Sequence, residues 1–189
     1  MKEETKEGFI PPHGGYHNLL TYQKAEIIYD ATVHFTKTFL DKYDRTVDQM
    51  VQAARSGKQN IREASMASGT SKETEIKLTN VARASLDELL ADYEDFLRTR
   101  KLPIWDRKHR LALRFDELNK TPNANYQTYV KALENPKAEI SANSLICLTK
   151  ITIWLLNRQL KALEKAFLKD GGLKQRMTKA RVSSRGKNQ

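Results

Sequence analysis

The sequence predicts an all-α protein, an antiparallel up-down-up-down four-helix bundle with a short extra helix and loop inserted between the third and last long helices. Apolar residues recur at spacings of three and four over four long segments, which is the period of amphipathic helices. The turn Ser68-Gly69-Thr70 joins two of these segments, and helices joined by so short a turn pack antiparallel. The chain has 189 residues, 39% of them hydrophobic, which is enough for one domain with a core of moderate size.

The first two long helices follow a polar N-terminal arm. Residues 1–19 contain Pro11-Pro12 and Gly14-Gly15 without apolar periodicity, so we expect an extended, flexible arm there. The first helix is expected over about residues 20–43. The second is expected to start from an N-cap at Thr46 and to reach about Met66, with Gly57 allowing its apolar face to dock closely on a neighbour.

The third and last long helices enclose an insert at about residues 103–138. Ser71 can cap a third helix over about 72–100, which Leu102-Pro103 ends. Within the insert we expect a shorter helix over 105–118 and one helical turn over 126–133, the remainder being irregular. The last helix should begin near Glu139 or Ser141, reach Leu168 and stop at Asp170-Gly171-Gly172, so that the bundle covers 20–170.

The most apolar part of the last helix, Leu145–Leu156, predicts a contact beyond a single bundle stripe. It includes Lys150 and is too short to cross roughly 30 Å of hydrocarbon, so no membrane partner is expected. A second apolar side must be covered either by the insert or by another subunit. The residues expected at a homo-oligomer interface are Leu145, Ile146, Ile153 and Trp154.

The net charge of +10 favours polyanionic partners. Arg55, Lys58 and Arg62 lie at i, i+3 and i+7 and form one basic stripe on the second helix. The flexible tail, residues 171–189, carries six Lys or Arg and no acid. The expected nucleic-acid-binding residues are therefore Arg55, Lys58, Arg62, Lys174, Arg176, Lys179 and Arg181. A solvated basic face and a disordered solubilising tail would give the same patterns.

Tyrosines offer a second route to nucleic acid, by stacking on unpaired bases. Tyr126 and Tyr129 in the insert are the best placed for this. Such residues more often cover the edge of a core, and we favour that interpretation. Tyr22 and Tyr29 recur at helical spacing and are assigned to packing or to an interface.

Signals for catalysis are weak, and we expect no enzyme activity, metal or cofactor. Di-iron bundles need Glu-x-x-His pairs, which this sequence lacks, and His13 and His17 lie in a glycine-rich arm. No glycine-rich phosphate loop or dinucleotide fingerprint is present. Cys147, within an apolar run, is expected to be inert. One cysteine and no signal-peptide pattern suggest a cytoplasmic protein.

Residues 45–102 resemble the small four-helix-bundle proteins encoded in intervening sequences of bacterial large-subunit ribosomal RNA genes. The resemblance is carried by ARSGKQNIREAS, SGTSKETEIKLTNVARASLDEL and DYEDFLRTRKL, and residues 123–177 are similar to the C-terminal part of the four helix bundle suffix domain group. The usual N-I-A-E-G run of the family stands here as Asn60-Ile61-Arg62-Glu63-Ala64.

The resemblance implies an up-down-up-down bundle and a homo-oligomer. Related accessory proteins of diversity-generating retroelements form pentameric barrels that bind nucleic acid and a reverse transcriptase. With the basic surfaces, this predicts a non-enzymatic oligomer, a pentamer among the options, that binds nucleic acid, RNA in preference to DNA. The alternatives are a protein-protein scaffold or accessory subunit of a polymerase, and a passenger without a strong ligand.

Overall fold

The computed structural model describes residue 10 and residues 13–186, and within them the chain is all-helical, with no strand. The all-α prediction is confirmed. The described elements are η1 (Tyr16–Asn18), α1 (Leu20–Phe39), α2 (Arg45–Ala67), α3 (Lys72–Thr99), α4 (Arg110–Asn119), α5 (Tyr126–Leu133), α6 (Ala138–Asp170) and α7 (Leu173–Gly186).

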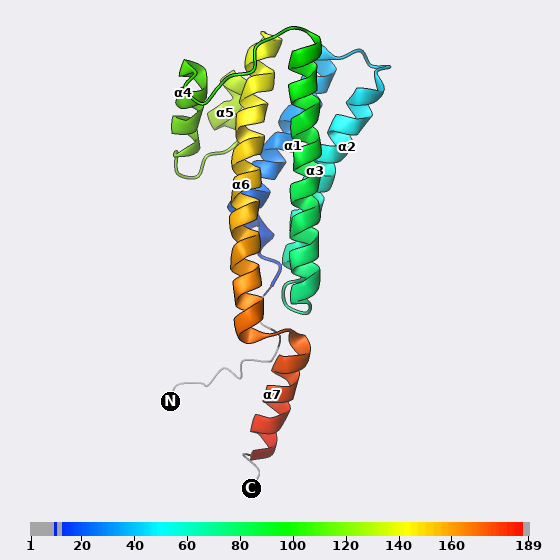
Figure 1. Cartoon of the computed structure of the whole chain (residues 1–189), viewed down its shortest axis with the longest axis vertical. Helices are drawn as coiled ribbons and strands as arrows, with labels where there is room; N and C mark the ends of the chain where they lie inside the picture. Colours follow the sequence, from blue (N-terminus) through cyan, green and yellow to red (C-terminus); the bar gives the residue numbers. More distant parts are fainter. Residues whose placement is uncertain (1–9, 11–12, 187–189) are drawn as a thin grey trace.

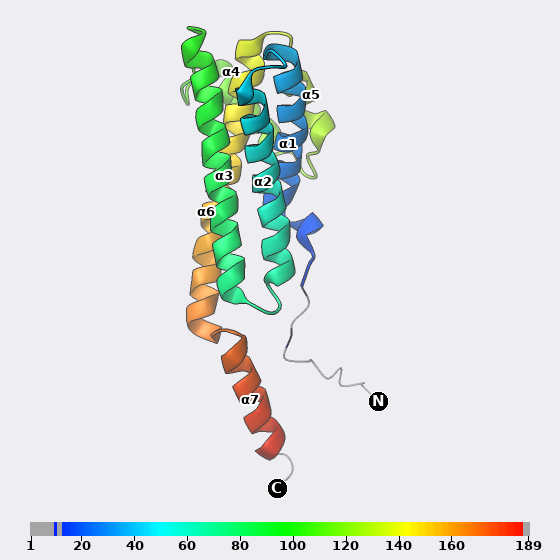
Figure 2. The ribbon, with the colours of Figure 1, turned by 90° about the vertical axis from the view of Figure 1, so that its right-hand side faces the viewer.

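Four long helices, α1, α2, α3 and α6, lie side by side along the molecule (Figure 1). α2 packs against α1 and α3, and α6 packs against the same two helices from the other side. Short turns connect α1 to α2 and α2 to α3, whereas α4 and α5 stand in the connection from α3 to α6 (Figure 2). The arrangement is bundle-like, with one continuous hydrophobic core between the long helices.

Aromatic rings of α1 and α3 fill the upper part of this core. The ring of Phe35 meets Tyr93 and Phe96 edge-on, with centroids 5.1 and 4.8 Å apart, in the geometry that ring quadrupoles favour. The buried Tyr93 hydroxyl donates a hydrogen bond to Thr32 Oγ1 at 2.9 Å. This bond ties α1 to α3 and satisfies a polar atom that water does not reach.

The hairpin of α2 and α3 follows the sequence prediction closely. Ser71 caps α3 by accepting a hydrogen bond from the Thr74 amide at 3.1 Å. Gly57 is buried where α2 and α3 meet. A Cβ atom at this position would lie 2.7 Å from Leu86 Cδ2, which is too close for two carbon atoms that are not bonded. The absent side chain therefore lets the two helices approach closely.

The turn between α1 and α2 differs from the prediction. α1 ends at Phe39 rather than near Tyr43, and the N-cap of α2 is Asp44 rather than Thr46. Asp44 Oδ1 accepts from the Thr46 amide at 2.9 Å, and Asp41 Oδ1 accepts from the Tyr43 amide at 2.8 Å. Carboxylates compete well for free amides, so these two aspartates stop one helix and start the next.

The insert forms two helices on the upper half of α6. α4 begins at Arg110 instead of Trp105, because the Trp105 amide donates to Asn143 Oδ1 of α6 at 2.8 Å and holds this segment in a loop. α5 covers the predicted range as a capped helix of 8 residues rather than one turn, with a capping box at Asn125. α4 and α5 both contact α6, so the insert covers the second apolar side of that helix.

Both ends of the described chain carry more structure than expected. Residues 1–9 and 11–12 of the expected arm, and 187–189 of the tail, lie outside the described residues. From His13 the chain follows α2, since the Gly14 amide donates to the Ser65 carbonyl at 3.2 Å, and η1 follows. The tail forms α7 instead of an irregular segment, because its sequence after Gly172 has no proline and many good helix formers. Gly171, at φ 69°, allows the bend that separates α7 from α6.

One described helical stretch, Ala138–Gln175, is long and apolar enough to cross a membrane by length and composition alone. The central helix of a bundle meets the same criterion, and 56% of the most apolar window is buried against the rest of the chain.

Candidate nucleic-acid interface

The basic stripe of α2 exists on one side of that helix, and tyrosines from neighbouring elements lie beneath it. Lys58 Nζ lies over the Tyr29 ring of α1 at 4.2 Å from the centroid. The Arg62 guanidinium carbon lies over the Tyr16 ring of η1 at 5.3 Å. Arg55 is exposed and makes no ion pair with a described residue. The cation–π contacts orient two of the three cations while leaving their charges available.

Two acids of α1 moderate the field of this stripe. Burial raises the pKa of the Asp30 carboxyl, Lys58 opposes that rise, and Glu26 adds to it. The opposing effect of Lys58 places its charge near Asp30, so part of the positive potential of the stripe is offset locally. The stripe is therefore a weaker anion-binding surface than its spacing suggests.

A second basic row runs along the exposed side of α6, where the sequence interpretation had placed no ligand contact. Arg158, Lys161, Lys165 and Lys169 follow at spacings of three, four and four, so they share one face of the helix. All four are exposed, and no ion pair joins any of them to a described carboxylate. We call these four residues the α6 row.

Trp154 begins the same face one turn before the α6 row. Its side chain is 55% exposed, and the Arg158 guanidinium carbon lies 4.8 Å from its ring centroid. An exposed indole beside unpaired cations combines a flat stacking surface with phosphate-binding groups. The spacing of three and four is visible in the sequence, but the exposure of these side chains and of Trp154 follows only from the fold.

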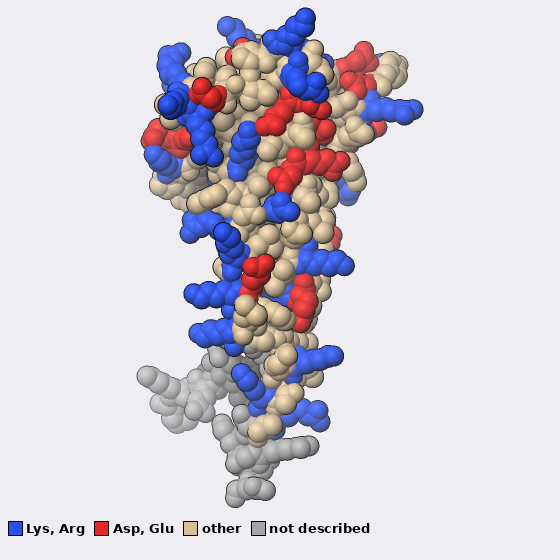
Figure 3. Space-filling model, viewed as in Figure 1, with Lys and Arg blue, Asp and Glu red and all other residues tan. Residues whose placement is uncertain are grey.

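α7 lies beyond the end of α6 (Figures 1 and 2) and carries further basic residues. Lys174, Lys179 and Arg181 are exposed on it, while the side chain of Arg176 lies outside the described ones. Residues 157–189 hold ten Lys or Arg against Glu164 and Asp170, so eight of the ten net positive charges belong to this part of the chain. Figure 3 shows acidic and basic side chains mixed on the upper half of this face and mostly basic ones on the lower half.

The predicted interface residues divide into two groups. Leu145 and Ile146 are 0% and 3% exposed, because the core and the insert cover them within one chain. Their assignment to a subunit interface is therefore wrong. Ile153 is half-buried and Trp154 is exposed, so only these two remain accessible to another molecule.

The insert tyrosines do not form an exposed stacking pair. Tyr129 is 0% exposed, and its ring contacts Phe115 with centroids 5.5 Å apart. Tyr126 is half-buried and donates from its hydroxyl to Glu134 Oε1 at 2.7 Å, and burial with this carboxylate raises its pKa. Tyr22 is buried in the core and Tyr29 supports Lys58, which agrees with the packing assignment.

Groups with catalytic potential are dispersed or inaccessible. Within the described part of the chain, no three His, Cys, Asp or Glu side chains gather in a way that could hold a metal ion. Burial raises the pKa of the Cys147 thiol to about 11, in the direction expected for an inert cysteine. Among the described residues, the features gathered at this surface are cations and one exposed aromatic side chain.

No protein-family model, curated protein or solved structure matches this chain.

Proposed function

We propose that this chain is a non-enzymatic protein that binds nucleic acid, RNA in preference to DNA, through the α6 row and α7. The observation that carries the proposal is the concentration of eight net positive charges in residues 157–189, next to an exposed tryptophan. Unpaired surface cations bind phosphates by releasing condensed counterions, and this requires no sequence-specific contact. Trp154 favours single strands, because a base can stack on an indole only when it is free of its own helix.

The architecture that supports this function is an up-down-up-down four-helix bundle of α1, α2, α3 and α6. The order of these helices and their pairwise packing support the proposal, as does the resemblance to the intervening-sequence bundle proteins. We further propose a homo-oligomer, in which each basic surface is repeated and weak phosphate contacts reinforce one another. Arg55, Lys58 and Arg62 then provide a secondary surface on α2.

The test measures binding of the full chain to labelled single-stranded RNA, duplex RNA and duplex DNA over a salt series. Its central variant, R158Q/K161Q/K165Q, removes three charges from the α6 row, and R55Q/K58Q/R62Q does the same on α2. The matched control K37Q/R45Q/K77Q removes three exposed charges from other faces. Light scattering gives the subunit number of each protein.

We expect the α6 variant to bind more weakly and to lower the slope of log K against log salt by about 2, since each lost phosphate contact on a single strand contributes roughly 0.7. W154A should selectively weaken the binding of single-stranded RNA, by about 1–3 kcal/mol. If the α6 variant loses no more affinity than the control, the α6 row is not the binding surface. A protein that binds none of the three nucleic acids at low salt would favour the alternative, a scaffold that contacts a protein partner.

A further inference from the structure

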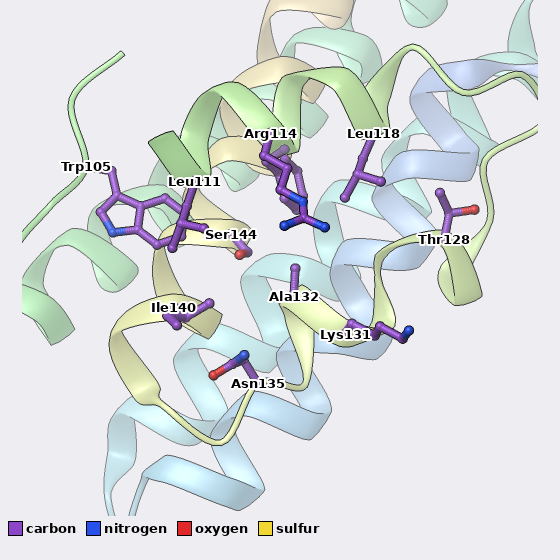
Figure 4. A pocket seen from close by; sticks show the side chains of 11 residues that line it. Trp105, Leu111, Arg114, Leu118, Thr128, Lys131, Ala132, Asn135, Ile140 and Ser144 are labelled. Atoms are coloured by element: carbon purple, nitrogen blue, oxygen red, sulfur yellow. The ribbon is translucent and has the colours of Figure 1, made fainter. Parts of the chain in front are cut away.

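A pocket of about 340 Å³ separates α4 from α5 and the beginning of α6 (Figure 4). It lies on the insert, away from the α6 row. α4 contacts α6 and meets α5 through the rings of Phe115 and Tyr129, whose centroids lie 5.5 Å apart. The pocket is the space that this arrangement leaves between the two short helices, and its volume is within the range of small-molecule sites.

The walls of the pocket are largely apolar. Phe115, Leu111 and Leu118 contribute from α4, Ile140 from α6, and Trp105 from the loop before α4. Trp105 is held in place, because its amide donates to Asn143 and its ring stacks on His109 with centroids 4.7 Å apart. A rigid aromatic and aliphatic wall of this kind favours a ligand with a hydrocarbon or aromatic body.

Two cations of the insert also line this apolar space. Arg114 points from α4 toward the space between the helices, and Lys131 of α5 lies along its rim (Figure 4). Neither forms an ion pair with a described carboxylate, although Lys120 and Glu117 pair with each other at the end of α4. Two uncompensated positive charges beside an apolar wall select for an anion.

One residue of α6 adds a hydroxyl to the lining of the pocket. Ser144 lines it with 1% of its surface exposed, and Figure 4 shows it near Leu111 and Trp105. A serine hydroxyl can both donate and accept a hydrogen bond. It therefore offers a ligand a polar contact in addition to the two cations.

We propose that this pocket binds a small amphipathic carboxylate. The carboxylate lies between Arg114 and Lys131, where the planar guanidinium can donate two parallel hydrogen bonds. The apolar body contacts Leu111, Leu118 and Trp105. The site does not depend on nucleic-acid binding, because it shares no residue with the α6 row or with the α2 stripe.

The experiment uses the full chain carrying W154F, which removes one of the two tryptophans and makes the fluorescence of Trp105 a reporter of the pocket. Octanoate and 3-phenylpropionate are titrated, with octanol and octylammonium as neutral and cationic counterparts of the first probe. Calorimetry on the chain with both tryptophans checks that W154F has not altered binding. R114Q/K131Q removes the two cations, S144A removes the hydroxyl, and R110Q/K137Q is a control that removes two exposed charges at the beginnings of α4 and α6.

We expect saturable binding of at least one carboxylate, weakened about tenfold or more by R114Q/K131Q and unchanged by R110Q/K137Q, since hydrogen bonds to charged groups are the stronger ones. S144A should weaken binding by a smaller factor. Octanol and octylammonium should bind less well than octanoate. The proposal is overturned if no carboxylate binds at millimolar concentration, if R114Q/K131Q binds as tightly as the control, or if octylammonium matches octanoate.

Discussion

The close approach of α2 and α3 can be tested by giving Gly57 a side chain. In an exposed helix, replacing glycine by alanine stabilises by up to about 1 kcal/mol through backbone entropy. At this position the new Cβ would lie 2.7 Å from Leu86 Cδ2 and 2.9 Å from Leu86 Cγ, both within a fully buried side chain. Ordinary contacts of this kind are about 3.5–4.0 Å, so Leu86 must move by roughly 1 Å in a close-packed core.

The two effects oppose each other, and the packing term is the larger. Overpacking a core typically costs about 1–3 kcal/mol, so G57A should destabilise the protein by about 1 kcal/mol after the gain in helix propensity is subtracted. L86A alone should cost about 2–5 kcal/mol, because it leaves a cavity. On the L86A background the added methyl group has room, so there G57A should stabilise the protein, by up to about 1 kcal/mol.

The assay is a double-mutant cycle measured by guanidinium unfolding and helical circular dichroism, with equal m-values required throughout. The decisive result is a change of sign: G57A is unfavourable in the parent chain, which keeps Leu86, and favourable in the L86A background. If G57A instead stabilises the parent chain by about 1 kcal/mol, the two helices are farther apart than the structure shows and the argument from the missing Cβ fails.

Two further predictions concern buried ionisable groups. With its pKa raised to about 11, Cys147 should react with iodoacetamide at pH 8 about 100-fold more slowly in the native protein than in guanidinium, and native rates within tenfold of the unfolded ones would contradict this. Lys24 is 4% exposed, donates to Asn119 Oδ1 and Tyr129 OH, and has its pKa lowered by burial. Between that lowered pKa and the ordinary value of 10.5, the unfolded chain binds more protons than the folded one, so the stability of the parent relative to K24M should rise with pH. Urea titrations at several pH values measure this difference in unfolding free energy, and a difference that does not change with pH would refute the prediction.

The long helices could be predicted because their signals are local. These signals are the apolar spacing, the Ser71 cap and the Gly171 stop, and each acts within a few residues. In the structure Ser71 caps α3 and Gly171 ends α6, as predicted. The errors occur where a competing polar group decides the boundary. Asp44 accepts from the Thr46 amide, so the second helix begins before the position that a cap at Thr46 would give, and Asn143, 38 residues away from Trp105, holds the start of the insert out of a helix.

The candidate binding surfaces depend on tertiary packing, so their residues could be found in the sequence but could not be ranked there. Arg55, Lys58 and Arg62 and the α6 row have the same helical spacing, so periodicity alone treats them alike. Only the fold distinguishes them: α1 brings Tyr29 and Asp30 close to Lys58, whereas the far end of α6 extends beyond the insert with its cations unpaired. The insert also determines which residues of the apolar run Leu145–Leu156 are exposed. By covering Leu145 and Ile146 it leaves Trp154 as the exposed aromatic residue of α6, and an aromatic residue next to a row of cations is better suited to a single-stranded polyanion than to an apolar subunit contact.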